Sequence, residues 1–364
     1  MTNTGGTDCI VVGGGLLGML TAYFLGREGL AVTLLEQGNV CRESSWAGGG
    51  ILSPLVPWDY PDAVSELVRW SQQHYPALVT ELRENSGIDP EWQQSGLLMA
   101  GTCLTPAISR WQARYPCRIE QLEPGRIQQL EPGLAAVTEQ ALLLPDVAQV
   151  RNPRLCQALA ASLRAQGAVV HEHVQVGGLR TAANAITGVM TDRGEFHSVR
   201  VVVAAGAWSA TLLGDLLPGL AVSPVRGQMI QYATSPGMLR HIVLANGRYL
   251  IPRRDGLVLA GSTLEYTGFE KKTTREARDS LAGFAMQLLP GLADCKIVNH
   301  WAGLRPGKRD AVPVIGEHPE IKGLYLNTGH FRNGVILAPA SVQLLLDSMM
   351  GRGSFTRFDA YSPK

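Results

Sequence analysis

The sequence lacks an excess of charge of either sign. Its 364 residues carry 32 Lys and Arg against 31 Asp and Glu, and charged residues make up only 17% of the chain. This balance provides no electrostatic basis for binding nucleic acid or an anionic membrane surface. Hydrophobic residues make up 45% of the chain, which is enough for one large core or for two domains.

The chain also lacks the cysteine and histidine patterns of metal sites. None of its six cysteines forms a C-x-x-C pair, and we expect them to be reduced thiols in a cytoplasmic protein. His171 and His173 would share one face of a strand predicted over 168–176. Since no third ligand stands at a useful spacing and no H-E-x-x-H occurs, we predict no metal site.

Residues 9–26 carry no charge and resemble a signal core or a membrane span. No basic residue precedes them, however, and their glycines stand where a nucleotide-binding turn needs them. We therefore expect a soluble, unprocessed chain with a short disordered start from Met1 to Thr7.

The stretch from Asp8 to Gly38 predicts a strand, a turn, a helix and a second strand. Residues 10–12 form an apolar run typical of a buried parallel strand, and residues 31–35 form another before Glu36. Between them, Gly13, Gly15 and Gly18 follow at G-x-G-x-x-G spacing and open a helix that runs to about Gly29.

This unit predicts a dinucleotide site. Gly13 allows a tight turn, Gly15 lets a pyrophosphate approach the backbone, and Gly18 lets helix and strand pack closely. The N–H groups of Leu16 and Leu17 would face the phosphates. Glu36 would accept hydrogen bonds from the ribose and repel a 2′-phosphate, which disfavours NADP. These residues alone do not decide between FAD and NAD.

The rest of the chain contains a further glycine cluster and several more predicted helices and strands. The loop after Glu36 contains a second glycine cluster at 48–50, and a long helix is predicted to about Asn85. Asn152 and Pro153 predict a helix start, with Asn152 as the N-cap. A buried strand within 198–209 then implies a discontinuous cofactor domain. Residues 225–259 predict antiparallel strands with one solvated face, and residues 325–350 predict a strand, a turn and a terminal helix.

Six motifs together resemble the D-amino-acid oxidase superfamily of flavoproteins, and within it the members that oxidise glycine. They are VVGGGLLG with Glu36, SSWAGGGIL, VVVAAGAWS, RYLIPR, WAGLRPG and GHFRNGVILAPA. The resemblance implies non-covalent FAD, because the cysteine that holds flavin covalently in sarcosine oxidases has no counterpart between Arg305 and Arg332. It implies hydride transfer from a small amine to flavin and reoxidation by dioxygen to hydrogen peroxide.

The resemblance also implies roles for individual residues. Arg305 would bind the substrate carboxylate, Tyr249 would assist it, and Arg332 would flank the substrate. The residues implied or predicted to bind the cofactor are Gly13, Gly15, Leu16, Leu17, Gly18, Glu36, Gln37, Ser44, Ser45, Gly49, Gly50, Val174, Ala205, Gly206, Trp208, His330, Arg332, Asn333, Gly334, Val335 and Ile336. Val174 would contact adenine through its backbone, and 332–336 would face the flavin pyrimidine.

The expected fold is α/β, with a discontinuous Rossmann-type FAD-binding domain and an α+β substrate domain that has a mainly antiparallel sheet. We assign residues 1–86, 146–222 and 299–364 to the first domain, and 87–145 and 223–298 to the second. The expected reaction converts glycine, and with it sarcosine or small D-amino acids, to a 2-oxo acid, ammonia and peroxide. By resemblance the enzyme would be a cytoplasmic homotetramer whose imine product could feed thiamine thiazole synthesis.

Two alternatives remain open at this point. One is a D-amino-acid dehydrogenase that passes electrons to a quinone at the membrane, although no amphipathic basic helix or apolar anchor supports it. The other is a flavin-binding subunit without turnover of its own, which the presence of Arg305 and Tyr249 argues against. The residues do not rank glycine, sarcosine and small D-amino acids as substrates.

Overall fold

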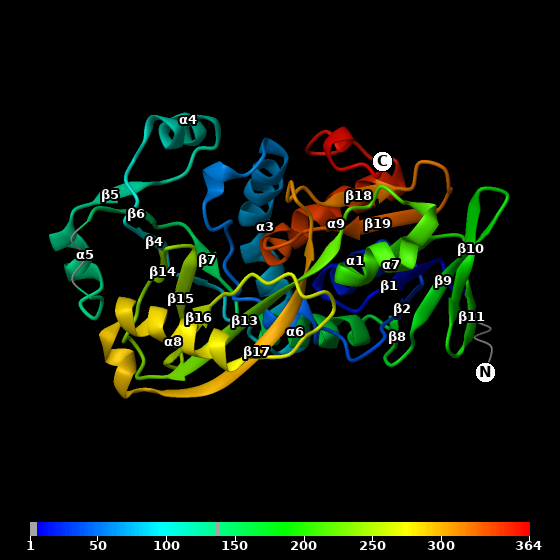
Figure 1. Ribbon diagram of the computed structural model, residues 1–364. Coiled ribbons are helices and arrows are strands. Elements are labelled where there is room, and N and C mark those ends of the chain that lie inside the picture. The colour runs from blue at the N-terminus through cyan, green and yellow to red at the C-terminus, as the bar shows by residue number, and fades with distance from the viewer. Residues whose placement is uncertain (1–5, 136–138) are drawn as a thin grey trace.

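The computed structural model describes residues 6–135 and 139–364. Figure 1 shows an elongated molecule with one large sheet toward each end. The disorder expected for Met1 to Thr7 falls mainly on residues 1–5, which lie outside the described residues. Within the described residues, no helix combines the length and the apolar character needed to cross a membrane.

The first large sheet has six strands in the order β18-β19-β12-β1-β2-β8. Its strands are β1 (Cys9–Val12), β2 (Val32–Leu35), β8 (Val169–His171), β12 (Val201–Val203), β18 (Val314–Glu317) and β19 (Leu324–Thr328). All neighbours pair in parallel except β18 and β19. The central strand β1 thus pairs with β12, 191 positions later in the chain, in the register Ile10 to Val201. This confirms the prediction of a parallel sheet whose strands come from distant segments of the chain.

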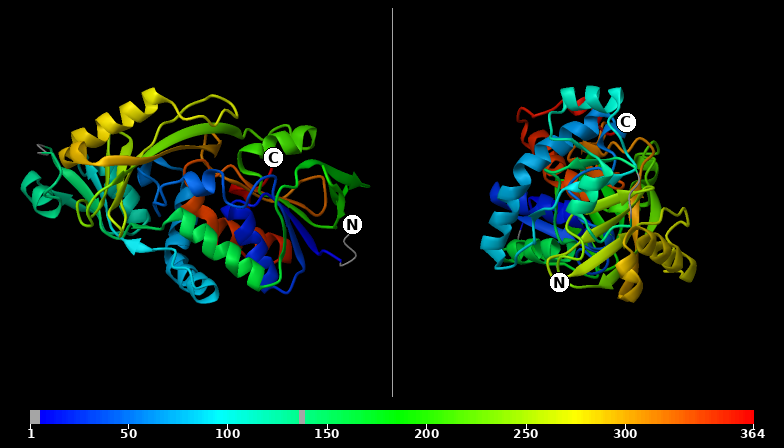
Figure 2. Two further views of the ribbon diagram at one scale, coloured as in Figure 1. Left: turned by 90° about the horizontal axis from the view of Figure 1, so that it is seen from below. Right: turned by 90° about the vertical axis from the view of Figure 1, so that its left-hand side faces the viewer.

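Alternate residues of β1 enter two different cores. Cys9 and Val11 face a core shared with four helices, α1 (Leu16–Arg27), α3 (Asp62–Ser86), α6 (Asn152–Ala165) and α9 (Gly334–Met350). Ile10 and Val12 face the opposite core, which is covered by α7 (Ser209–Leu213) and by a small antiparallel sheet of β9 (Val176–Ala182), β10 (Ala185–Thr191) and β11 (Gly194–His197). In Figure 2, α1, α6 and α9 lie side by side on the first face.

The second large sheet has eight strands in the order β17-β13-β16-β15-β14-β4-β6-β5. They are β4 (Leu97–Ala100), β5 (Glu120–Leu122), β6 (Ala141–Leu144), β13 (Ser223–Ala233), β14 (Ile242–Ala245), β15 (Arg248–Pro252), β16 (Leu257–Gly261) and β17 (Lys296–Gly307). Only β4 and β14 pair in parallel, which confirms a mainly antiparallel sheet.

The prediction that this sheet has one solvated face is wrong. Ile230, Leu250 and Val258 pack beneath α8 (Arg275–Leu288) and α5 (Pro124–Leu130), and Met229 and Ile251 pack on the opposite face against the segment 51–58. The polar residues that suggested solvent contact are partly internal. Gln228, for example, is fully buried.

Three smaller predictions are also corrected. The strand expected over 168–176 ends at His171, and His173 has a φ of 58° in the turn that follows, so the two histidines do not share a strand face. The helix α6 begins at Asn152, so this residue is not its N-cap. The expected loop after Glu36 contains a short helix, α2 (Ser44–Ala47).

The remaining elements are short. They are α4 (Pro106–Arg114), the antiparallel pair β3 (Gln93–Gln94) and β7 (Ala148–Gln149), and 3-10 turns at Pro57–Asp59, Gly206–Trp208, Gly214–Leu216, Pro290–Asp294 and Phe358–Ala360.

Candidate active site

A cavity of about 310 Å³ follows the carboxyl ends of β1, β2, β12 and β19 and reaches Arg305 on β17. Ligands of open α/β sheets bind at such strand ends. Most of the predicted site residues line this cavity: Gly13, Gly15, Leu16, Leu17, Glu36, Gln37, Ser44, Ser45, Val174, Ala205, Gly206, Trp208, His330, Arg332, Gly334, Val335 and Arg305. The structure thus brings together residues that are up to 320 positions apart.

The turn after β1 is shaped by glycines that have no room for a side chain. Gly13 has a φ of +108°, and a Cβ on it would lie 2.5 Å from the carbonyl oxygen of Ala204. A Cβ on Gly18 would lie 1.9 Å from the carbonyl oxygen of Gly13. Gly18 does not line the cavity; instead it lets α1 pack directly on the turn.

The start of α1 is tied to α2. The backbone N–H of Leu16 donates to Ser45 Oγ at 2.8 Å. This N–H was predicted to face the phosphates, but in the structure it already has a hydrogen-bond partner. Helix N-termini leave several N–H groups without helical partners, and a serine hydroxyl commonly accepts from one of them. Leu17 lines the cavity beside it.

Glu36 stabilises the turn after β1 by accepting backbone hydrogen bonds. Its Oε2 accepts from the N–H of Gly14 at 2.7 Å, and its Oε1 accepts from the N–H of Gly38 at 2.7 Å. Burial raises the pKa of the Glu36 carboxyl above its ordinary value, although both backbone hydrogen bonds act in the opposite direction. A carboxylate offers about four acceptor sites, so capacity for a ribose hydroxyl remains.

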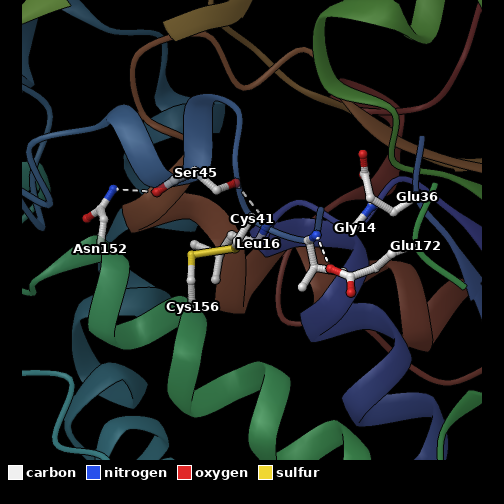
Figure 3. The surroundings of a disulfide bond; sticks show 9 residues. Gly14, Leu16, Glu36, Cys41, Ser45, Asn152, Cys156 and Glu172 are labelled. Carbon is white, nitrogen blue, oxygen red and sulfur yellow. Dashed lines mark hydrogen bonds between the residues drawn. A yellow bond between two sulfur atoms is a disulfide. The ribbon is translucent and has the colours of Figure 1, made fainter. Parts of the chain in front are cut away.

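The segment between Glu36 and α2 is held from below by α6 (Figure 3). Cys41 forms a disulfide with Cys156 of α6, and its N–H donates to the carbonyl of Gly14 at 2.8 Å. Asn152 donates from Nδ2 to the carbonyl of Ser45 at 2.8 Å. The prediction that all six cysteines are reduced is therefore wrong for this pair. The two cysteines are 115 residues apart, and only packing of α6 beneath the turn brings them together.

Gly49 and Gly50 lie outside the cavity and allow close backbone packing. A Cβ on Gly50 would lie 2.0 Å from the carbonyl oxygen of Val150, and one on Gly49 would lie 2.5 Å from Ile251. Arg253 is buried and donates to the carbonyls of Gly49 and Val150 at 2.9 and 3.0 Å. Burial lowers the pKa of Arg253 to about 10. Sequence reasoning missed this residue, because the final arginine of RYLIPR resembles a surface charge.

Arg305 projects from β17 into the cavity. Its Nη2 donates to Ser262 Oγ at 2.8 Å, and its Nη1 donates to the carbonyl of Thr263 at 3.2 Å. Burial lowers its pKa, and nearby Arg332 lowers it further, while the adjacent Tyr249 raises it. A partly buried guanidinium that faces a cavity without a carboxylate partner is suited to bind an anionic ligand.

Tyr249 and Arg332 occupy different positions relative to Arg305. Tyr249 lies behind the cavity wall, where its hydroxyl donates to Met229 Sδ at 3.8 Å. Arg332 lines both the main cavity and a second cavity of about 370 Å³, which is bounded by 55–60, β4 and the turn between β14 and β15. Arg332 therefore stands between the two spaces.

The segment after β19 contains residues that the prediction included and residues that it missed. His330 is buried, its Nε2 lies 2.9 Å from Ser341 Oγ, and burial lowers its pKa to about 3, so it is neutral. Asn333 and Ile336 are buried and do not line the cavity. Asn327 and Thr328 do line it and were missed, although they end a predicted strand. Neither amide atom of Asn327 has a partner within the described residues.

These features fit FAD. The glycine turn leaves room for a pyrophosphate against backbone, Glu36 stands at the second strand end, and Asn327 presents an unpaired buried amide to the cavity. The helix α9 begins at the cavity, and its first residues, Gly334 and Val335, line the cavity. A positive helix end stabilises negative charge on a bound group. Across the described ranges, no three His, Cys, Asp or Glu side chains gather as a metal site.

Comparison with known proteins gives consistent results. Residues 8–348 match the family described as FAD dependent oxidoreductase. A glycine oxidase of Pseudomonas aeruginosa is 46% identical over 355 residues, covering 97% of this chain and 98% of the relative. A glycine oxidase of Pseudomonas putida is 44% identical over 356 residues, covering 98% of each chain. The crystal structure of a glycine oxidase from Bacillus cereus has a TM-score of 0.91, with 30% identity and 99% of both chains covered.

Proposed function

The chain belongs to the FAD dependent oxidoreductase family, and from this premise we propose that it oxidises glycine to glyoxylate, ammonia and hydrogen peroxide. The observation that carries the proposal is Arg305, a partly buried guanidinium that faces the cofactor cavity. Two relatives at 44–46% identity over nearly the whole chain, both named glycine oxidase, support it. Bound FAD would accept a hydride equivalent from the α-carbon and pass the electrons to dioxygen.

In this proposal Arg305 binds the substrate carboxylate, and Tyr249 and Arg332 complete the substrate side. A planar guanidinium matches a carboxylate with two parallel hydrogen bonds. Holding the carboxylate fixes the α-carbon relative to the cofactor, and such orientation supplies much of the rate in reactions without a protein base. The amine must lose its proton before the α-carbon is oxidised, and the positive charges of Arg305 and Arg332 favour the neutral amine.

We assign the cofactor to the residues of the main cavity. Glu36 would accept from the ribose, the backbone of Val174 would contact adenine, and the backbone of 332–336 would face the flavin pyrimidine. Glu36→Lys replaces an acceptor with a donor-only cation and should greatly weaken FAD binding. Unchanged flavin occupancy of this variant after dialysis would show that Glu36 does not bind the ribose.

The decisive experiment assays peroxide formation by the purified holoenzyme with glycine, sarcosine and D-alanine, with and without an artificial electron acceptor. We expect peroxide with glycine and no requirement for the acceptor. Turnover only with the acceptor would favour a quinone-linked dehydrogenase, and no turnover with any substrate would overturn the proposal. Acid precipitation should release all flavin as FAD, whereas flavin that stays on the precipitated chain would refute non-covalent binding.

Three broader assignments remain proposals. We propose the division into 1–86, 146–222 and 299–364 for the cofactor domain and 87–145 and 223–298 for the substrate domain. We also propose a cytoplasmic homo-oligomer, which analytical ultracentrifugation and fractionation of cells would test. Release of the imine to thiamine thiazole synthesis would be tested by thiamine dependence of a strain that lacks the gene.

A further inference from the structure

Two of the three residues that accept hydrogen bonds from Arg305, Ser262 and Thr263, belong to one short segment, 262–265, which we term the strap. It follows β16 and lies against β13. Arg226 and Glu265 exchange backbone hydrogen bonds of 2.9 and 3.0 Å, and the N–H of Gln228 donates to Thr263 Oγ1 at 2.8 Å. The strap is thus bound to β13 through the backbone of Glu265 and through the side chain of Thr263.

A buried ion pair fixes the strap further. Arg226 donates to Glu265 Oε2 from Nε at 2.9 Å and from Nη2 at 2.5 Å, and the Arg226 side chain is only 6% exposed. Gln228 Nε2 donates to the other carboxylate oxygen at 2.9 Å, and Thr263 Oγ1 donates to the same oxygen. Every carboxylate oxygen of Glu265 is therefore occupied, so the strap has little freedom to move.

The guanidinium of Arg305 lies flat between the strap and β13. A Cβ on Gly227 would lie 2.2 Å from both Nη1 and Nη2 of Arg305, so a side chain at 227 would displace the group. Nη1 donates to the carbonyls of Thr263 and Arg226 at 3.2 and 3.5 Å, which are long contacts, while Nη2 donates to Ser262 Oγ at 2.8 Å.

Some of the N–H groups of Arg305 remain available to a ligand. A guanidinium has five N–H donors, and three are engaged by the strap and by β13. One N–H on Nη2 and the Nε–H remain for a ligand. Ser262 accepts the only hydrogen bond shorter than 3 Å from Arg305 within the described residues, so its loss would leave the guanidinium held only by the longer contacts of Nη1 to the carbonyls of Thr263 and Arg226.

We propose that Ser262 is a positioning residue that orients Arg305 and thereby sets the affinity of the site for carboxylate-bearing substrates. The inference rests on the proposed role of Arg305 as the carboxylate anchor. Ser262 is itself 92% buried and is not required to touch the substrate. Its effect should be confined to ligands that have a carboxylate, because other ligands do not use the oriented N–H groups.

The test compares Ser262→Ala with the wild-type holoenzyme. Acetate binding, followed by the change in flavin absorbance, should weaken roughly tenfold or more, as expected when an ionic group loses a hydrogen bond. KM for glycine should rise by a similar factor, while kcat changes by less than about threefold. Ser262→Thr retains the hydroxyl and should restore binding.

The matched control is Ser280→Ala. Ser280 Oγ also accepts from an arginine, Arg248 Nη2 at 3.0 Å, but this pair is exposed and lines neither cavity. We expect this variant to bind acetate as the wild type does. Oxidation of a simple primary amine should also be unchanged by Ser262→Ala, as should flavin content.

The outcomes separate this inference from the proposed function. Weaker acetate binding by Ser262→Ala supports the inference even if glycine is not oxidised. Unchanged acetate affinity together with unchanged KM overturns it, while glycine oxidation by the wild type would leave the proposed function standing. Equal damage to acetate binding, amine oxidation and flavin content would also overturn it, because it would show a merely structural role.

Discussion

Both large sheets are buried on two faces, but they contribute to the cavity in different ways. The six-stranded sheet contributes the tight turn after β1, at which Gly13 and Gly18 have no room for a Cβ, together with the ends of β12 and β19 and the start of α9, and we term this the backbone side. The eight-stranded sheet contributes the side-chain head of Arg305, held by Ser262 and by carbonyl groups. The cofactor side should therefore be sensitive to a Cβ added at Gly13 or Gly18, and the substrate side to the loss of one functional group.

Gly18→Ala tests the backbone side and should have the largest effect. The new Cβ would lie 1.9 Å from the carbonyl oxygen of Gly13, so α1 must move away from the turn. We expect a protein that retains almost no flavin after gel filtration. Gly26→Ala is the control on the same helix, because its Cβ meets only the flexible end of Gln166 at 3.2 Å. Full flavin content in Gly18→Ala would contradict the backbone-built site.

Arg305→Ala tests the side-chain side. Removing one partner of a desolvated ion pair costs about 2–5 kcal/mol, or about 30- to several-thousand-fold in kcat/KM for glycine. The loss should lie mainly in KM, and flavin content should stay near normal, because Arg305 faces a cavity. A primary amine without a carboxylate should lose far less. If glycine oxidation falls by only a few-fold, Arg305 is not the anchor.

Arg253→Ala sharpens the contrast between the two arginines. Arg253 is buried and bonded to the carbonyls of Gly49 and Val150, so its loss leaves these buried acceptors without their donor. We expect poor expression and a free energy of unfolding lowered by about 1–3 kcal/mol, with all substrates affected equally. A selective rise in KM for glycine would instead place Arg253 among the substrate-binding residues.

The local features of the site were predictable from sequence, and the features that depend on tertiary packing were not. The glycine turn, Glu36 and Arg305 stand in short motifs whose spacing has a mechanical reason, and they line the cavity as expected. The roles of Ser262 and Arg253 depend on how the strap and the loop at 48–50 lie against other strands. No spacing along the chain reports such contacts.

The same distinction explains the errors in the fold. The parallel strands have continuous apolar runs and were placed correctly, because burial on both faces leaves no alternation. In the eight-stranded sheet, polar residues such as Gln228 alternate with apolar ones, which suggested a solvated face. Gln228 is buried because Glu265 and Thr274 satisfy its amide, and this polar pairing cannot be seen in the sequence.

Reduction of the Cys41–Cys156 disulfide tests how firmly α6 supports the backbone side. The bond closes a loop of over 100 residues, so reduction should lower the free energy of unfolding by about 2–4 kcal/mol. Urea unfolding with and without a phosphine reductant measures the change, and Cys156→Ser should reproduce it. Cys103→Ser, at an exposed free cysteine, is the control. Six reactive thiols in the denatured, unreduced protein would contradict the disulfide.

The smallest effect concerns His330, a side chain within the backbone-built turn after β19. Burial lowers its pKa to about 3, against about 6.5 when unfolded. The unfolded chain therefore binds a proton that the folded protein does not, so the stabilising contribution is complete above pH 6.5 and is lost as pH falls below it. One such group steepens the fall by up to about 1.4 kcal/mol per pH unit. Urea unfolding between pH 7.5 and pH 5 measures how steeply the free energy of unfolding falls with pH. We expect a shallower fall in His330→Gln, by the equivalent of about one proton bound on unfolding.

The control for that measurement is His197→Gln, because the His197 side chain is 68% exposed whereas His330 is buried. Neither variant should differ much from the wild type in its pH slope above pH 7. If the slopes of His330→Gln and the wild type coincide down to pH 5, His330 must become protonated in the folded protein. A positive side chain would then stand beside the start of α9 and add to the positive charge on this wall of the cavity. A reduced slope would instead show that His330 stays neutral and acts only by bonding Ser341, which leaves the electrostatics of this wall to the helix end and to Arg332.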